Sequence, residues 1–294
     1  MKNRKSAWER LFDYGNAIVL SLIILITLYP FLHVLFASFS NPARLGAHRG
    51  ILLFPLGLQI DGYRLVFANR DIWTGYANTL FYVIVGTSLN VLLTSLIAYT
   101  LSRRGLMLNR LIMVLIVFTM YFSGGMIPVY LTMGQLGLMG SRWAIIVPGL
   151  VSTMNVIIMR TNFQALPASL EEAARLDGAK ELDILFRIVL PLSMPVISVM
   201  FLFYGVSRWN AWFDAMLYLR DRDKYPLQLI LREILIFDST TEMMNSLGTG
   251  QRGQDMSQII KYATTIVATV PILAIYPFLQ KYFVKGVMIG ALKG

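Results

Sequence analysis

Long apolar stretches alternate with polar connections along most of the chain. Several of these stretches are long enough, or nearly so, to cross a hydrocarbon layer of about 30 Å at about 1.5 Å per residue. They lie at Asn16–Phe39, Ala77–Leu101, Leu111–Met133, Trp143–Met159, Leu192–Val206 and Tyr262–Phe283. The pattern therefore predicts an all-α membrane protein with six transmembrane helices.

The composition supports this class of protein. Of the 294 residues, 56% are hydrophobic and 14% are charged, whereas a soluble domain has about a quarter charged residues. A globular core of this length cannot bury so much apolar surface, so lipid must be the solvent for much of it. The chain has no Cys and only two His, which excludes thiolate chemistry and argues against a metal site. We expect no catalytic residue, no metal and no cofactor in this chain.

The net charge of +10 is explained by membrane topology. The basic residues are scattered through connecting segments and no nucleic-acid-binding signature occurs, so no nucleic-acid partner is expected. Arg103, Arg104 and Arg110 lie in or beside one short loop, whereas the next short loop has only Arg142. Because Lys and Arg accumulate on the cytoplasmic side, both termini are predicted to be cytoplasmic.

This topology predicts a division of the chain into four parts. They are a cytoplasmic N-terminal tail (1–15), a first transmembrane helix with an outer loop (16–76), a core (77–283) with an inner loop (160–191), and a cytoplasmic C-terminal tail (284–294).

The inner loop contains recognisable helix signals. Ser169, followed three residues later by Glu172, fits a capping box, and acidic residues in the first turn suit the helix dipole. Gly178 stands where a left-handed helix stop is expected. The loop therefore predicts short helices over about Leu170–Asp177 and Lys180–Val189. On these signals alone, an ordinary solvated loop remains an alternative.

The residues of this loop also resemble a known motif. Glu172-Ala-Ala-Arg-Leu-Asp-Gly-Ala179, followed by Ile188-Val-Leu-Pro191, resembles the EAA motif of permease subunits of bacterial ATP-binding-cassette (ABC) importers. It lies between the fourth and fifth predicted spans, as in the sugar branch of that family. The Trp209-Asn210 pair and the C-terminal Tyr282–Gly294 resemble the same branch, closest to permeases for complex oligosaccharides or polysaccharide fragments. The resemblance extends from about Asn78 to Gly294.

The resemblance implies a type I ABC importer permease fold in a bacterial cytoplasmic (inner) membrane. The partners that it implies are a second homologous permease subunit, two ATPase subunits that bind ATP and Mg, an extracytoplasmic solute-binding protein, and membrane lipid. It implies that the loop helix docks on the ATPase, with Glu172 paired to a basic residue there. The coupling residues that it indicates are Glu171, Glu172, Ala173, Ala174, Asp177 and Gly178.

The spans contain no Asp, Glu, Lys or Arg in their middle parts. Carriers driven by protons or sodium ions usually need such groups at mid-membrane, so their absence argues against an ion-driven carrier. Neutral polar and aromatic side chains are present instead, and they either line a sugar path or pack helices together. The candidates for the path are Asn90, Tyr204, Trp209 and Asn210. Gly124, Gly125 and Pro128 predict a kink in the third span.

The predicted substrate is a saccharide, namely a small oligosaccharide. A slight basic excess in the outer segments admits an acidic, alginate-like one without establishing it. The alternatives are a permease for a non-sugar solute, an ion-coupled carrier or channel, and a membrane-embedded enzyme, for which no clustered acids or nucleophile–base pair can be assembled. Gly248–Gly253 matches G-x-G-x-x-G but lacks the βαβ context that a dinucleotide site requires.

Overall fold

The computed structural model describes residues 6–103, 105, 107–236 and 252–291, and within these ranges every regular element is helical. The chain forms two compact units. Unit 1 comprises Met1–Arg70 and Leu231–Thr269, and unit 2 comprises Asp71–Ile230 and Val270–Gly294. Residues 1–5 and 292–294 of the predicted tails lie outside the described residues, as does most of the Gly248–Gly253 segment.

Unit 1 contains α1 (Ala7–Ser38), which begins inside the predicted N-terminal tail, α2 (Pro42–Ala47), α3 (Asp61–Ala68) and the first part of α16 (Arg252–Ala291). The outer loop is fixed to α1, because the Tyr29 hydroxyl accepts a hydrogen bond from the Leu52 N–H (3.2 Å). Gly62 allows α3 to approach α16 closely, since a Cβ there would lie 2.6 Å from Ile259 Cγ2.

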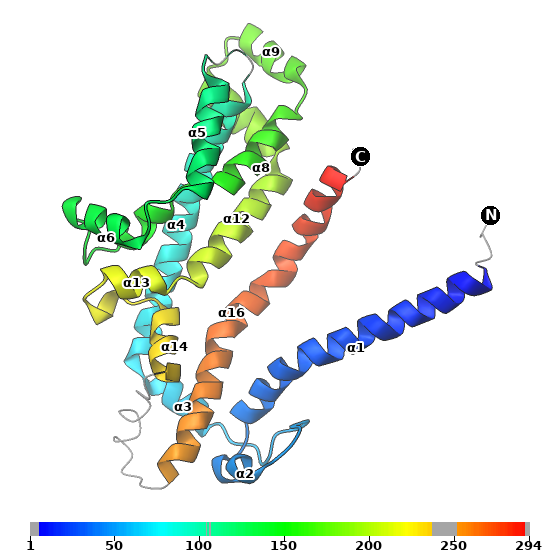
Figure 1. Ribbon diagram of the computed structural model, residues 1–294, viewed down its shortest axis with the longest axis vertical. Helices are drawn as coiled ribbons and strands as arrows, with labels where there is room; N and C mark the ends of the chain where they lie inside the picture. Colours follow the sequence, from blue (N-terminus) through cyan, green and yellow to red (C-terminus); the bar gives the residue numbers. More distant parts are fainter. Residues whose placement is uncertain (1–5, 104, 106, 237–251, 292–294) are drawn as a thin grey trace. The chain divides into compact units, whose positions relative to one another are not determined.

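Unit 2 contains the remaining elements, which run from almost all of α4 to the end of α16 (Figure 1). In chain order they are α4 (Arg70–Ser102), α5 (Asn109–Tyr121), α6 (Met126–Gln135), α7 (Trp143–Ile146), α8 (Thr153–Gln164), α9 (Ala168–Leu176), α10 (Glu181–Ile184), α11 (Leu190–Leu192), α12 (Met194–Trp209), α13 (Phe213–Tyr218) and the start of α14 (Leu227–Ile236). Short 3-10 turns follow α7 (Val147–Gly149) and α13 (Arg222–Lys224), and a π-helical turn, Leu185–Val189, follows α10.

Every predicted span is mainly helical, but only some of the spans are single unbroken helices. The helices that are long and apolar enough to cross a membrane lie within Trp8–Ser38, Arg70–Ser102 and Met256–Ile275. The predicted third and fourth spans are bent pairs, with angles of 112° between α5 and α6 and of 53° between α7 and α8. The predicted fifth span lies almost wholly in α12, which follows an 87° bend at the end of the predicted inner loop. The described residues thus provide three candidate spans, or six if each bent pair forms one span.

Local sequence explains the sharpest bend. The predicted kink at Gly124 and Gly125 is confirmed, because α5 ends at Tyr121 and α6 begins after Gly125, whose φ is +86°. Glycine adopts that left-handed conformation at little cost. The angle of 112° is larger than a packing kink, so α6 leaves the direction of α5 altogether.

The predicted outer segment after α12 is folded onto α4. The Asn78 amide donates hydrogen bonds to the carbonyls of Asp223 (2.7 Å) and Tyr225 (3.1 Å). The Tyr82 hydroxyl donates to the carbonyl of Lys224 (2.8 Å). These bonds satisfy backbone groups that would otherwise be unpaired in a turn, so α4 serves as the scaffold of unit 2.

Candidate functional site

The inner-loop helix α9 lies beyond the ends of α4, α5 and α8 at one end of unit 2 (Figure 1). It begins at Ala168, with Pro167 as its N-cap, and no side chain caps it. The predicted capping box with Ser169 is therefore wrong. The proline ring holds φ at −59°, which suits the start of a helix and places Ser169 inside the first turn.

The C-terminal end of α9 matches the prediction. Gly178 has a φ of +79°, which confirms the left-handed stop. The Ala179 N–H donates to the Ala174 carbonyl (2.9 Å) and the Gly178 N–H donates to the Arg175 carbonyl (3.0 Å). This pair of bonds is a Schellman motif, and it fixes the direction in which the chain leaves α9.

An ion pair anchors the start of α9. Glu171 is buried and contacts Arg103, which directly follows α4. The Arg103 guanidinium also stacks 3.9 Å from the centre of the Tyr99 ring. Burial lowers the pKa of Arg103 from its usual value, which reflects the cost of desolvating the cation, and a carboxylate partner offsets that cost. Sequence reasoning assigned Arg103 to topology alone and missed this contact.

A second cluster anchors the residues that follow α9. Glu181 accepts a hydrogen bond from the Tyr99 hydroxyl (2.7 Å) and another from Arg175 Nε (3.0 Å). The bond to Glu181 raises the pKa of the Arg175 guanidinium, because the carboxylate favours its charged form. Tyr99, near the end of α4, therefore contacts Arg103 of the first anchor and Glu181 of the second.

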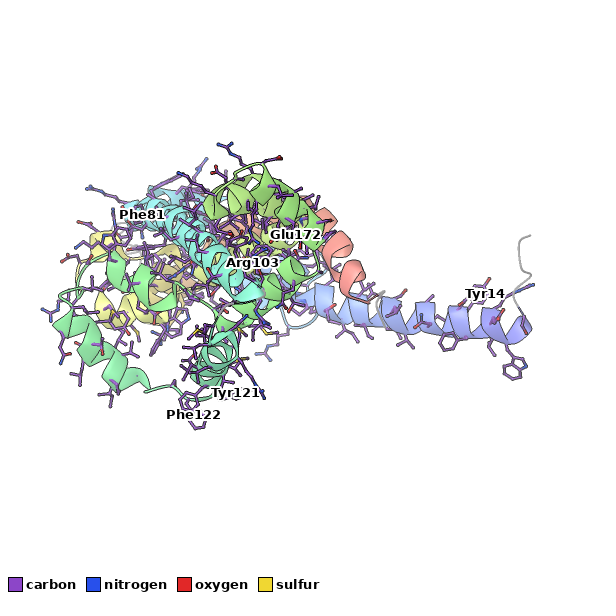
Figure 2. All side chains as sticks on the ribbon, turned by 90° about the horizontal axis from the view of Figure 1, so that it is seen from above. Tyr14, Phe81, Arg103, Tyr121, Phe122 and Glu172 are labelled. Carbon is purple, nitrogen blue, oxygen red and sulfur yellow. The ribbon has the colours of Figure 1, made fainter. Side chains whose placement is uncertain are left out.

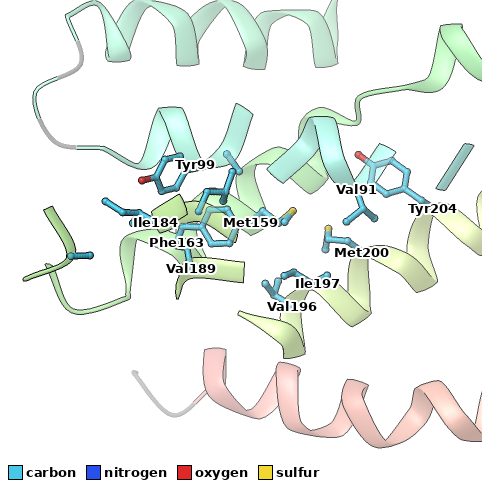
Figure 3. Packing of buried hydrophobic residues seen from close by; sticks show 13 residues of the cluster. Val91, Tyr99, Met159, Phe163, Ile184, Val189, Val196, Ile197, Met200 and Tyr204 are labelled. Carbon is cyan, nitrogen blue, oxygen red and sulfur yellow. The ribbon is translucent and has the colours of Figure 1, made fainter. Parts of the chain in front are cut away.

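Apolar packing connects the same segments (Figure 3). Ala174 of α9 is buried in a cluster to which α4, α8, α12 and the π-helical turn also contribute. Its members are Val91, Ala98, Tyr99, Met159, Phe163, Ala174, Ile184, Leu185, Val189, Val196, Ile197, Met200 and Tyr204. Close-packed side chains, which compress little, therefore connect α9 to α4, α8 and α12.

The opposite face of α9 is exposed. Glu172 and Ala173 lie there, together with Leu176, whose exposed fraction is 89%. In Figure 2, the helix that carries Glu172 lies beside Arg103. Asp177 and Gly178 are exposed as well. The predicted coupling residues thus divide into an inward pair, Glu171 and Ala174, and an outward set.

Two predicted path residues lie between helices. Asn90 is fully buried, and its amide donates to the carbonyls of Gly149 and Leu150. The Tyr204 hydroxyl lies 2.7 Å from Thr94 Oγ1 and accepts from the Ser152 N–H (3.1 Å). Both side chains thus pack α4 and α12 against the α7–α8 bend, and their role in a sugar path stays a prediction.

Arg208 contacts Asn90 and extends its polar cluster inside unit 2. It lies in the last turn of α12, and only 8% of the residue is exposed. Its guanidinium donates to Asn90 Oδ1 (3.3 Å) and to the carbonyls of Ile145 and Ile146. A Cβ at Gly149 would lie 3.2 Å from Arg208 Nη2. The cation thus satisfies carbonyls that the bend leaves without helical partners.

The other two predicted path residues differ in burial. Trp209 is buried, packs edge-on to Tyr76 with ring centres 6.3 Å apart, and lines a pocket of about 340 Å³ whose other walls are mostly apolar. Asn210 is exposed, ends α12, and donates to the Val206 carbonyl (2.9 Å). Within the part of the chain that the structure describes, no hydrogen bond or ring contact joins these two side chains to Asn90 or Tyr204.

The anchoring of α9 can be tested by removing Glu171. We expect Glu171→Gln to weaken the docking of α9 by about 3 kcal/mol, because it leaves the buried Arg103 without a carboxylate. Tryptic cleavage after Arg175 should then be at least roughly tenfold faster. The matched control is Arg187→Gln, which breaks an exposed pair with Asp183 worth less than about 1 kcal/mol. Equal cleavage rates in the two variants would contradict the anchor.

The polar contact around Arg208 can be tested with two asparagines. We expect Asn90→Ala to lower the stability of the detergent-purified protein by about 2 kcal/mol, because a buried cation loses an acceptor and two carbonyls lose a donor. Asn210→Ala, at an exposed position, should cost less than about 0.5 kcal/mol. Both changes are measured as thermal midpoints from size-exclusion profiles of heated samples. A midpoint for Asn90→Ala as high as that for Asn210→Ala would refute the stabilising role of the contact between Asn90 and Arg208.

Comparisons with known proteins agree with this arrangement. Residues 90–219 match the family described as "Binding-protein-dependent transport system inner membrane component". The polygalacturonan/rhamnogalacturonan transport system permease protein YtcP of Bacillus subtilis (strain 168) is 43% identical over 97% of this chain and 99% of its own length. Protein LplC of the same organism is 41% identical over 100% of this chain and 98% of its own.

A solved structure has the same fold. It is a chain of a bacterial ABC transporter involved in the import of the acidic polysaccharide alginate, with a TM-score of 0.89 and 34% identity, and the match covers 96% of this chain and 100% of that one. The anchored inner-loop helix, the apolar helices and these similarities lead to one assignment: the chain belongs to the inner membrane components of binding-protein-dependent transport systems, the permeases of ABC importers.

Proposed function

We propose that this chain forms half of the translocation path of an ATP-driven importer for an acidic oligosaccharide. It crosses the membrane six times, with each bent helix pair counted as one span, and both termini lie in the cytoplasm. The observation that carries the proposal is the two-faced helix α9, which is anchored to the spans on one side and exposed on the other.

The exposed face of α9 has the chemistry of a docking surface for an ATPase subunit. Leu176 keeps 89% of its surface exposed, and covering such a side chain stabilises a complex by roughly 2 kcal/mol. Glu172 offers a carboxylate to a basic residue of the partner, and Ala173 permits close approach. Two ATPase subunits bind the ATP and Mg, so this chain needs no cofactor and performs no chemistry itself.

The anchored face transmits the motion of the ATPase subunits to the spans. When they close on ATP, they displace α9, and the Arg103–Glu171 pair carries that displacement to the end of α4. The contact of Tyr99 with Glu181 carries it to the start of α10. Because the apolar cluster also includes α8 and α12, the spans move together and open the path that this chain forms with a second permease subunit.

The proposed substrate class is supported by what the relatives are named for. YtcP is named for polygalacturonan and rhamnogalacturonan transport, and the solved neighbour belongs to an importer of alginate, an acidic polysaccharide. We therefore propose uronate-containing oligosaccharides as substrates, which an extracytoplasmic solute-binding protein delivers to the outer segments.

The coupling role is tested at Gly178. A Cβ there meets no atom within 4 Å, but the φ of +79° disfavours a β-branched side chain. We therefore expect Gly178→Val to abolish sugar uptake while the subunit still inserts and ATP hydrolysis continues uncoupled. Gly178→Asn should retain most of the transport, since Asn tolerates the left-handed conformation. Normal transport by the Val variant in uptake assays would count against the role of this turn.

The substrate class is tested with the purified importer. The permease is copurified with its partner permease, its ATPase and its binding protein, and ATP hydrolysis is measured over a panel of saccharides. We expect stimulation by oligogalacturonides or alginate oligomers and little stimulation by neutral oligosaccharides of the same length. Stimulation by neutral sugars alone would reject the acidic class while leaving the coupling mechanism intact, and stimulation by non-sugar solutes alone would reject the saccharide class.

A further inference from the structure

A pocket of about 550 Å³ lies where α5 begins and meets α8. Arg110 and Asn109 come from the first turn of α5, and Arg160 comes from α8. Met113, Val114 and Val117 complete the lining. The pocket is at the same end of unit 2 as α9, since Arg160 Nε donates to the Leu101 carbonyl (2.9 Å) at the end of α4, close to Arg103.

The polar end of the pocket carries uncompensated positive charge. The acidic residues nearby are already used, since Glu171 pairs with Arg103 and Glu181 with Arg175. Among the described residues, no carboxylate lies in salt-bridge contact with the two pocket arginines. The Asn109 amide is not available to a ligand, because it donates to the carbonyls of Leu101 (3.1 Å) and Arg103 (3.4 Å). The hydrogen-bond donors that the pocket offers to an anion are therefore its two guanidinium groups.

The rest of the pocket is apolar and runs along one face of α5. Residues 110, 113, 114 and 117 are spaced three, four and seven positions apart, so they share one side of the helix. The charged group stands at the helix start, and the apolar side chains extend from it over about 10 Å along the helix axis. A ligand that fits has an anionic head and a hydrocarbon body that continues into the membrane.

We propose that this pocket binds an anionic phospholipid of the leaflet that faces α9, with its phosphate held by Arg110 and Arg160 and its acyl chains along Met113 and Val117. Charge complementarity selects this occupant over a neutral lipid, because each arginine near the surface attracts an anionic headgroup. The apolar lining selects a lipid over a free anion, since a soluble phosphate would leave that surface uncovered. The site is independent of the sugar and of ATP.

The site can be tested by photocrosslinking in the whole importer. The complex is reconstituted into phosphatidylcholine vesicles that contain either phosphatidylglycerol or phosphatidylcholine with a diazirine on the acyl chain, and crosslinked peptides are mapped by mass spectrometry. We expect phosphatidylglycerol to label the Met113–Val117 segment preferentially. The preference should fall about fivefold for each arginine removed by Arg110→Gln and Arg160→Gln.

Controls separate the site from general effects of charge and folding. Arg187→Gln removes an exposed arginine elsewhere and should leave the labelling unchanged. Arg110→Lys combined with Arg160→Lys keeps the charge and should retain the preference, while a normal size-exclusion profile shows that each variant is folded. The proposal would be overturned if both lipids labelled the segment equally, or if the double Gln variant kept the same labelling. It would also be overturned if inorganic phosphate displaced the lipid, or if this segment crosslinked to the second permease instead. None of these outcomes depends on sugar transport.

Discussion

The contact between Arg103 and Glu171 joins two segments that are far apart in the chain. Arg103 directly follows α4, and Glu171 lies in the first turn of α9. Neither charge is well solvated, so each requires the other. Because the pair forms where α4 ends, α9 has a fixed position relative to the spans, and its outward face can serve as a docking surface without a separate domain to support it.

The same physical constraint governs the interior of unit 2. Bending a helix inside a membrane exposes backbone groups that lipid cannot satisfy. At the bend between α7 and α8, Arg208 and Asn90 satisfy the freed carbonyls. The glycines beside Arg208 make room for the guanidinium, since a Cβ at Gly86 or Gly149 would lie 3.2 Å from it. The broken helices are therefore stable here because polar side chains of α4 and α12 reach their carbonyls.

The sequence was mostly informative where the cause was local. Apolar runs predicted the helices, Gly178 predicted the left-handed stop, and Gly125 predicted the kink. It was uninformative where two distant segments meet: no spacing showed that Glu171 turns inward to Arg103 while Glu172 stays exposed. The burial of Arg208 could not be foreseen for the same reason, since its acceptors come from other helices. One local signal failed: the helix begins two residues earlier than the capping box predicts, because Pro167 and not Ser169 is its N-cap.

The most direct measurement uses the absence of native cysteine. A single cysteine, Leu176→Cys, reports on the face of α9 opposite the anchor. We expect a membrane-impermeant maleimide to label it in inside-out vesicles but not in intact cells, and we expect bound ATPase subunits to protect it. Labelling from the external medium, or an equal labelling rate with and without the ATPase, would contradict the proposal that α9 is a cytoplasmic docking helix.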